Sequence, residues 1–158
     1  MDTAHKPTLP EAMIDQALML DNQLCFAMYS ASLAMTKAYK KILADLDMTY
    51  PQYLVMLVLW ENNQMSVSEL GAKLFLDSGT LTPLLKRMEI MGLLSRARDA
   101  ADERRVLVTL SAEGKALRKR AMQVPEKLVC MLPPLEQIKS LVAQLKDVRK
   151  NLQDGVEE

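Results

Sequence analysis

The chain has 158 residues, of which 49% are hydrophobic and 25% are charged, so it can bury a core as one soluble globular domain. Its 20 basic and 20 acidic residues cancel, which argues against nonspecific polyanion binding by the whole surface but not against a local basic patch. No apolar run approaches the roughly 20 residues of a membrane span. The N-terminus also lacks the order of a secretory signal, so we expect a cytoplasmic protein without membrane contact.

The first long helix is expected from Asp21 to Leu46, after a leader over residues 1–14 with one helical turn following Pro10. The stretch contains neither glycine nor proline, and its apolar side chains recur at spacings of three, four and seven residues. A helix of about 25 residues is too long for a monomer of this size to cover. The positions on the apolar face are Leu24, Met28, Met35, Ala38 and Ile42.

Two capping boxes open the next two helices. Thr49 with Gln52, and Ser66 with Glu69, have the spacing at which two residues cap a helix reciprocally. The first of these helices carries the apolar run YLVMLVLW, which predicts burial on most sides. The second is short and is expected to end near Phe75.

A third helix and a hairpin follow. Asp77–Gly79 cap a helix that we expect to run to Met91 and to stop at Gly92. After Gly92 the apolar period changes from helical to alternating. Residues 93–98 and 104–110, separated by the polar tip DAADE, therefore predict a β-hairpin.

The C-terminal part is expected to be helical again. Ser111 caps a helix that runs toward Cys130 and is expected to bend near Pro125, because proline disrupts a helix interior. Pro133–Pro134 end this helix, and a last amphipathic helix covers residues 135–152.

The order of these elements predicts a mainly α fold with a small β-hairpin wing. Two short helices joined by a tight turn and followed by a hairpin describe a winged helix-turn-helix, here residues 49–110 with the wing at 93–110. The helices at 15–46 and 112–153 are expected to mediate dimerisation. We interpret the whole chain, 1–158, as a single domain.

A winged helix-turn-helix suggests double-stranded DNA as the partner. Hydroxyl groups at a helix N-terminus suit phosphate binding, and basic side chains further along can contact phosphates or bases. Residues 86–105 hold six basic and four acidic residues, so a merely solvated surface is the alternative interpretation. The candidate DNA-binding residues are Asp77, Ser78, Thr80, Thr82, Lys86 and Arg87 in the third helix, and Arg104 and Arg105 in the wing.

The two cysteines, Cys25 and Cys130, lie 105 positions apart. A purely structural disulfide is unusual in a reducing cytosol, and buried inert thiols are the alternative. Cys25 lies near the start of the first long helix, where a thiol can become a reactive thiolate. The single histidine, His5, has no cysteine or carboxylate cluster around it, so we expect no metal site and no cofactor.

Several stretches of the sequence resemble one particular protein family. LDSGTLTPLLKRMEIMGLL followed by DERRVLVTL resembles the recognition helix and wing of MarR-type transcriptional regulators. DNQLCFAMYS and TYPQYLVMLVLWE resemble the OhrR group of organic-hydroperoxide sensors within that family. The resemblance covers roughly residues 20–130, and Cys130 is similar to the second thiol of the two-cysteine branch.

The resemblance implies a redox mechanism. Cys25 would be the peroxidatic thiol, oxidised by an organic hydroperoxide, and Cys130 the resolving thiol. Tyr29, Tyr39 and Tyr50, which follow Cys25 by 4, 14 and 25 positions, would support the thiolate. Tyr39 lies roughly 21 Å along the helix from Cys25, so its support would have to come from the partner subunit of a homodimer. In the resembled proteins the disulfide joins two subunits; the sequence itself leaves open whether it would form within or between them.

The resulting hypothesis is a redox-sensing repressor, not an enzyme, whose reduced dimer binds a palindromic operator and whose oxidation derepresses a peroxide-detoxification gene. One alternative keeps the fold but has a small phenolic ligand in the dimer crevice as the signal, with incidental cysteines. The other is a thiol peroxidase, for which the winged module would have no purpose. The sequence contains no phosphate-binding glycine loop or nucleophile elbow.

Overall fold

The computed structural model describes residues 10–157, and His5 with the first part of the predicted leader lies outside them. The chain divides into two compact units, one up to Ala38 and one from Tyr39 onward. Helices predominate, with one small antiparallel sheet, which confirms the predicted fold class. Among the described residues, no helix combines the length and the apolar character needed to cross a membrane.

The smaller unit consists of α1 (Glu11–Ala17), a 3-10 turn η1 (Leu20–Asn22) and most of α2 (Leu24–Ile42). The side chains of Asn22 and Gln23 donate to carbonyls at the C-terminal end of α1, which satisfies groups that a helix end leaves free. The expected single helix from Asp21 to Leu46 is therefore wrong at both ends. Short 3-10 turns, which often occur at helix ends, replace its first and last residues.

The larger unit contains the core. The apolar end of α2 and the turn η2 (Ala44–Leu46) lead into α3 (Tyr50–Asn62), α4 (Val67–Leu74) and α5 (Ser78–Ile90). Both predicted capping boxes are present at α3 and α4. Fully buried apolar side chains come from each of these helices and from the sheet; the largest are Leu43, Met56, Leu59, Leu70, Leu81, Leu85 and Met88.

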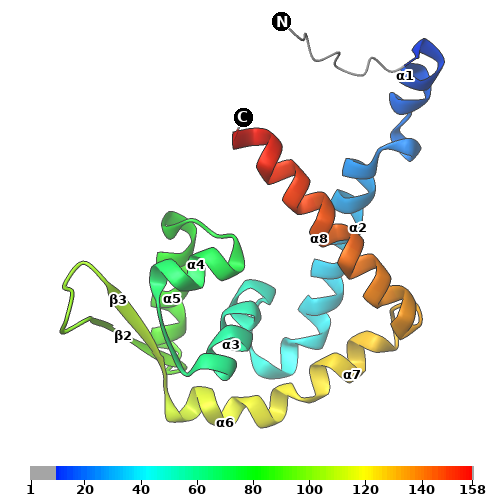
Figure 1. Ribbon diagram of the computed structural model, residues 1–158. Coiled ribbons are helices and arrows are strands. Elements are labelled where there is room, and N and C mark those ends of the chain that lie inside the picture. The colour runs from blue at the N-terminus through cyan, green and yellow to red at the C-terminus, as the bar shows by residue number, and fades with distance from the viewer. Residues whose placement is uncertain (1–9, 158) are drawn as a thin grey trace, which may run out of the picture. The chain divides into compact units, whose positions relative to one another are not determined.

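The sheet has three strands in the order β1-β3-β2. The predicted hairpin consists of β2 (Leu94–Arg98) and β3 (Val106–Leu110), which pair antiparallel and project away from α3–α5 (Figure 1). The third strand, β1 (Gln64–Ser66), pairs with β3 on its other edge, with Met65 opposite Val108. Its three residues are too few to show an alternating pattern, so this strand was not predicted.

Two glycines position the elements around the sheet. Gly92 has φ 76°, a left-handed conformation that glycine adopts readily at the end of a helix. Gly114 lies so close to β2 that an added Cβ would sit 2.1 Å from the Leu93 carbonyl oxygen. The Trp60 indole N–H donates to the Gly114 carbonyl at 2.8 Å, so α3 and α6 (Ala112–Ala121) are held together at this point.

The C-terminal segment continues with α7 (Gln123–Val129) and α8 (Leu135–Glu157). The break between α6 and α7 lies at Met122, close to the expected bend. Pro125 has no N–H to donate to the carbonyl four residues earlier, that of Ala121, so the helix is interrupted there. None of the described residues of α8 is buried, although the helix has a continuous apolar face.

Candidate redox and nucleic-acid sites

Cys25 lies in the first turn of α2, where it is the second residue. The first helical hydrogen bond of α2 runs from the Ala27 N–H to the Gln23 carbonyl at 3.0 Å, so the N–H groups of the preceding residues point out of the helix end. The thiol is free and exposed. Asp21 is in the separate turn η1, and no acidic residue occupies the first turn of α2. The Cys25 thiol therefore lies at the positive end of the α2 helix dipole.

Cys130 ends α7 as its C-cap residue and is also free and exposed. Its Sγ donates a weak hydrogen bond to the carbonyl of Glu126, one turn earlier in the same helix, at 3.4 Å. The thiol is thus turned back onto its own helix. Cys25 belongs to the smaller unit and Cys130 to the larger one.

Two of the three predicted supporting tyrosines lie together. The rings of Tyr39 and Tyr50 stack with centroids 4.2 Å apart. The ring centroid of Tyr53, which is not among the predicted residues, lies 5.9 Å from that of Tyr39. Burial, followed by the proximity of Tyr50, raises the pKa of Tyr39 to about 12. Burial also raises the pKa values of Tyr50 and Tyr53. All three phenols are therefore protonated donors at neutral pH.

Tyr29 has a different environment. It lies four residues after Cys25 on α2, the spacing that places two side chains on one helix face. Its side chain is 62% exposed. The structure thus brings Tyr39 and Tyr50 together within the larger unit, while Tyr29 shares the smaller unit with Cys25.

The candidate recognition helix α5 has one buried and one exposed face. Leu81, Leu84, Leu85 and Met88 point into the core. The predicted DNA-binding side chains of this helix are all exposed: Ser78, Thr80, Thr82, Lys86 and Arg87.

Asp77 caps the N-terminus of α5. The Thr80 backbone N–H donates to its Oδ1 at 2.8 Å and the Thr80 hydroxyl to its Oδ2 at 3.0 Å. The backbone bond first, and then the hydroxyl bond, hold the pKa of this carboxyl below its usual value. Asp77 therefore fixes the start of the helix and the orientation of Thr80, a role that its place in the capping motif indicates.

The two wing arginines are held differently. Arg105 forms an ion pair with Glu69 of α4, with 3.3 Å between Nη2 and Oε1. Glu69 also accepts from the Ser66 hydroxyl, which is the main reason that its pKa lies below the usual value. Among the described residues Arg104 has no ion-pair partner, so its guanidinium is free to contact a ligand.

A second ion pair ties the wing to the recognition helix. The Arg96 guanidinium of β2 and its backbone N–H both donate to Glu89 of α5, at 2.8 Å each. The side-chain bond from Arg96 is the first cause of the lowered pKa of Glu89. Neither this pair nor the contact of Arg105 was predicted, because both contacts depend on how the elements pack.

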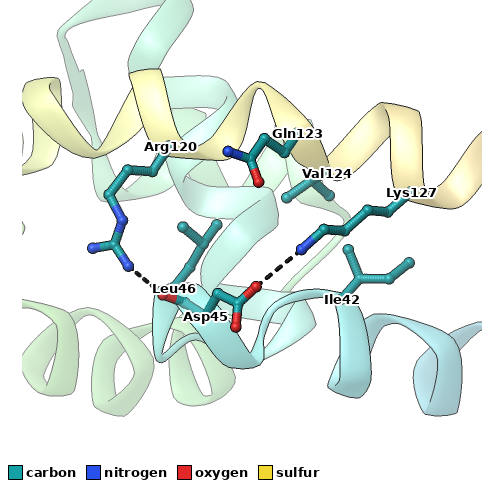
Figure 2. Close-up of a pocket in the computed structure, with 7 residues that line it drawn as sticks. All are labelled: Ile42, Asp45, Leu46, Arg120, Gln123, Val124 and Lys127. Carbon is teal, nitrogen blue, oxygen red and sulfur yellow. Dashed lines mark hydrogen bonds and ion pairs between the residues drawn. The ribbon is translucent and has the colours of Figure 1, made fainter.

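A small cavity of about 200 Å³ lies between η2 and the α6–α7 segment (Figure 2). Its apolar lining comes from Ile42, Leu46 and Val124. Asp45 is exposed beside it and accepts from Lys127 Nζ at 2.9 Å, which is the first cause of its lowered pKa. Within residues 10–157, no group of histidine, cysteine or carboxylate side chains has the arrangement of a metal site.

Comparison with known proteins identifies related regulators. Residues 37–120 match the family described as transcriptional regulator SarA/Rot. The chain is 51% identical to the organic hydroperoxide resistance transcriptional regulator of Bacillus subtilis over 108 residues, which cover 68% of this chain and 74% of that protein. It is 45% identical to the HTH-type transcriptional regulator TtmR of Methylorubrum extorquens over 148 residues, or 93% of this chain and 76% of the relative.

Among solved structures, the chain resembles AbfR of Staphylococcus epidermidis. Reduced AbfR bound to DNA superposes with a TM-score of 0.76 at 37% identity, covering 89% of this chain and 99% of the other. Disulfide-formed AbfR superposes with a TM-score of 0.61 at 33% identity, covering 94% and 100%. From the fold and these similarities, the chain belongs to the MarR family of winged-helix transcriptional regulators and, within it, to the organic hydroperoxide resistance type.

Proposed function

We propose that this protein is a redox-sensing repressor whose reduced homodimer binds a palindromic DNA operator in the cytoplasm. An organic hydroperoxide oxidises Cys25, a disulfide with Cys130 follows, and the operator is released. The observation that carries the proposal is the free, exposed Cys25 thiol in the first turn of α2. It occurs in a chain 51% identical to an organic hydroperoxide resistance regulator.

The DNA-binding part of the proposal rests on α5 and the wing. The exposed face of α5 carries Ser78, Thr80 and Thr82 near its N-terminus and Lys86 and Arg87 further along. Hydroxyls at this end suit phosphates and base edges, and the two cations suit phosphates or guanine. Arg104, at the tip of the hairpin, would reach a neighbouring minor groove, while Arg105 leaves Glu69 for the DNA backbone.

A dimer is supported by apolar surface that a single chain does not cover. In the smaller unit Leu18, Leu20 and Leu33 are exposed, and in α8 Leu141 and Leu152 are exposed as well. Soluble monomers rarely display apolar faces of this kind unless a partner covers them. A second copy of the chain would cover both segments, in agreement with the predicted dimerisation helices at 15–46 and 112–153. Two recognition helices would then meet two half-sites of a palindrome, about 34 Å apart.

Formation of the Cys25 thiolate would depend on the helix N-terminus that carries it and on tyrosine hydroxyls. A cysteine has an ordinary pKa of about 8.5, so it needs stabilisation to react at neutral pH. The helix N-terminus contributes positive potential, and Tyr29 lies one turn along the same face. Tyr39 and Tyr50 remain protonated donors, and among residues 10–157 their hydroxyls have no hydrogen-bond partner. We assign them to the thiolate of the partner chain.

The chemistry proceeds in two steps. The Cys25 thiolate attacks the distal oxygen of ROOH; an S–O bond forms, the O–O bond breaks, and the alkoxide leaves and takes up a proton as the alcohol ROH. The Cys130 thiol then attacks the sulfenic sulfur, so that an S–S bond forms and water leaves. The disulfide requires the two Cα atoms to come within about 7 Å, and the movement that achieves this would change the separation of the recognition helices.

The experiment is an operator gel shift with and without cumene hydroperoxide. The Cys25→Ser variant should bind the operator like the wild type and remain bound after hydroperoxide is added. Cys130→Ser should respond at first but then accumulate sulfenate or over-oxidised Cys25, as detected by mass spectrometry. Normal release of Cys25→Ser from the operator by hydroperoxide would contradict the proposal.

A further inference from the structure

The segment that carries Cys130 is joined to the rest of the fold by an interrupted helix. The α6 helix ends at Ala121 and α7 begins at Gln123, with Pro125 removing the hydrogen bond that would bridge the break. Figure 1 shows α6 and α7 following one another with a change of direction between them. Such a break allows α7 to turn relative to α6 more easily than a continuous helix would.

One residue contacts both sides of this break. The Arg120 guanidinium, in the last turn of α6, donates to the backbone carbonyl of Asp45. Lys127, in α7, donates to the Asp45 carboxylate with 2.9 Å between Nζ and Oδ2. Figure 2 shows both side chains reaching down to Asp45 from the α6–α7 segment. We call this pair of contacts the Asp45 clasp.

The second thiol lies on the same helix as one half of the clasp. Lys127 precedes Cys130 by three residues, so the two side chains lie on neighbouring parts of the α7 surface. Cys130 Sγ donates to the Glu126 carbonyl, and in the described residues this is its one hydrogen bond. The thiol therefore follows α7. This helix is anchored in the core by the buried Val124, and Lys127 adds a contact to Asp45 of η2. To form a disulfide, Cys130 must leave Glu126 and bring its Cα within about 7 Å of another cysteine.

We propose that Asp45 is a positioning residue for the Cys130 thiol: its contact with Lys127 holds α7 in the reduced arrangement and slows the condensation of Cys130 with oxidised Cys25. The inference rests on the proposed function, since it concerns the second chemical step. The clasp supplies no atom to that step; it determines how often α7 turns into the reactive geometry. The contact is an exposed ion pair, so releasing it should accelerate the step by a modest factor, roughly two- to fivefold.

The variants separate the two halves of the clasp. Asp45→Ala and Lys127→Met each remove the carboxylate–ammonium contact, while the Arg120 contact survives in both because its acceptor is the Asp45 backbone. Lys119→Met is the matched control: it removes an exposed lysine of α6 that has no ion pair within the described part of the chain. The double variant Asp45→Ala/Lys127→Met should behave like either single variant, because both changes remove one interaction.

The measurement is rapid-quench mass spectrometry of the full-length dimer after one equivalent of cumene hydroperoxide. We expect unchanged formation of Cys25 sulfenate and roughly two- to fivefold faster conversion to the disulfide in Asp45→Ala and Lys127→Met. High salt should accelerate this conversion in the wild type and less in the variants, since it screens the ion pair. Hydrogen exchange over residues 123–130 of the reduced protein should rise in the same two variants.

Several results would overturn the inference. These are disulfide formation no faster than in Lys119→Met, additive effects in the double variant, or unchanged hydrogen exchange in α7. If the wild type forms its disulfide and the variants match its rate, only the clasp is refuted. If the wild type forms no Cys25–Cys130 disulfide, the proposed function fails, and the positioning role fails with it.

Discussion

Two parts of the molecule differ in the burial of their apolar side chains. In the region of α3–α5 and the sheet, Leu59, Leu70 and Leu81 are completely buried, and helices, strands and caps contribute to one core. In residues 10–38 and in α8, by contrast, none of the described residues is buried, although leucine, methionine and valine recur along both. The first region buries its apolar side chains within its own chain, whereas the second leaves them exposed.

The same substitution, glycine to alanine, should have opposite effects in the two regions. Gly114→Ala should lower the free energy of unfolding by about 1–3 kcal/mol or more, because its Cβ would sit 2.1 Å from the Leu93 carbonyl oxygen. Gly155→Ala in α8 should raise it by at most about 1 kcal/mol, because alanine is the better helix former and nothing lies within 4 Å. Urea denaturation at fixed protein concentration measures both. Equal effects would mean that α8 is packed as tightly as the core.

A charge placed on α8 should affect the association of two chains rather than the stability of the core. Leu141→Glu places a carboxylate on the exposed apolar face of α8. It should weaken the proposed dimer about tenfold or more, because one fewer leucine would be buried between the chains. Lys146→Glu reverses an exposed charge on the same helix and is the control. Sedimentation equilibrium measures the dissociation constants. Identical constants for the two variants would remove α8 from the interface.

The buried tyrosines should have a smaller effect on stability than the substitutions above, and this effect should depend on pH. Burial raises the pKa of Tyr39 from 10.0 to about 12, so the folded state favours its neutral form. The stability from this preference is fully present below pH 10 and is lost as pH rises from 10 toward 12. An ultraviolet titration should show a phenol that ionises near pH 12 in the wild type and is missing in Tyr39→Phe. An unchanged titration curve would show that Tyr39 is not the group held neutral.

Features that depend on residues close together in the sequence could be predicted, whereas features that depend on packing could not. The capping boxes at Thr49 and Ser66 and the cap at Asp77 depend on residues three positions apart, and all three are confirmed. The strand β1 was missed because it exists only through its pairing with β3. The bend expected near Pro125 is confirmed as a break at Met122, since proline disrupts the bond to the carbonyl four residues before it.

For the candidate sites, local sequence patterns indicated the residues but not their contacts with other elements. Local sequence patterns predicted that Cys25 lies near the start of a helix and that polar side chains line α5. The structure leaves Cys25 and these side chains of α5 exposed. The contacts of Arg105 with Glu69 and of Lys127 with Asp45 join residues 36 and 82 positions apart. No local pattern indicates such pairs, because they depend on how the elements pack.

In the proposed mechanism, oxidation of one sulfur atom, that of Cys25, releases the DNA. A direct test is to titrate the wild-type protein on a fluorescent operator with cumene hydroperoxide, while fluorescence anisotropy and mass spectrometry follow the same samples. The fraction of operator released should rise in step with the fraction of Cys25 oxidised. Operator still bound when Cys25 is fully oxidised, or released while Cys25 remains reduced, would contradict it.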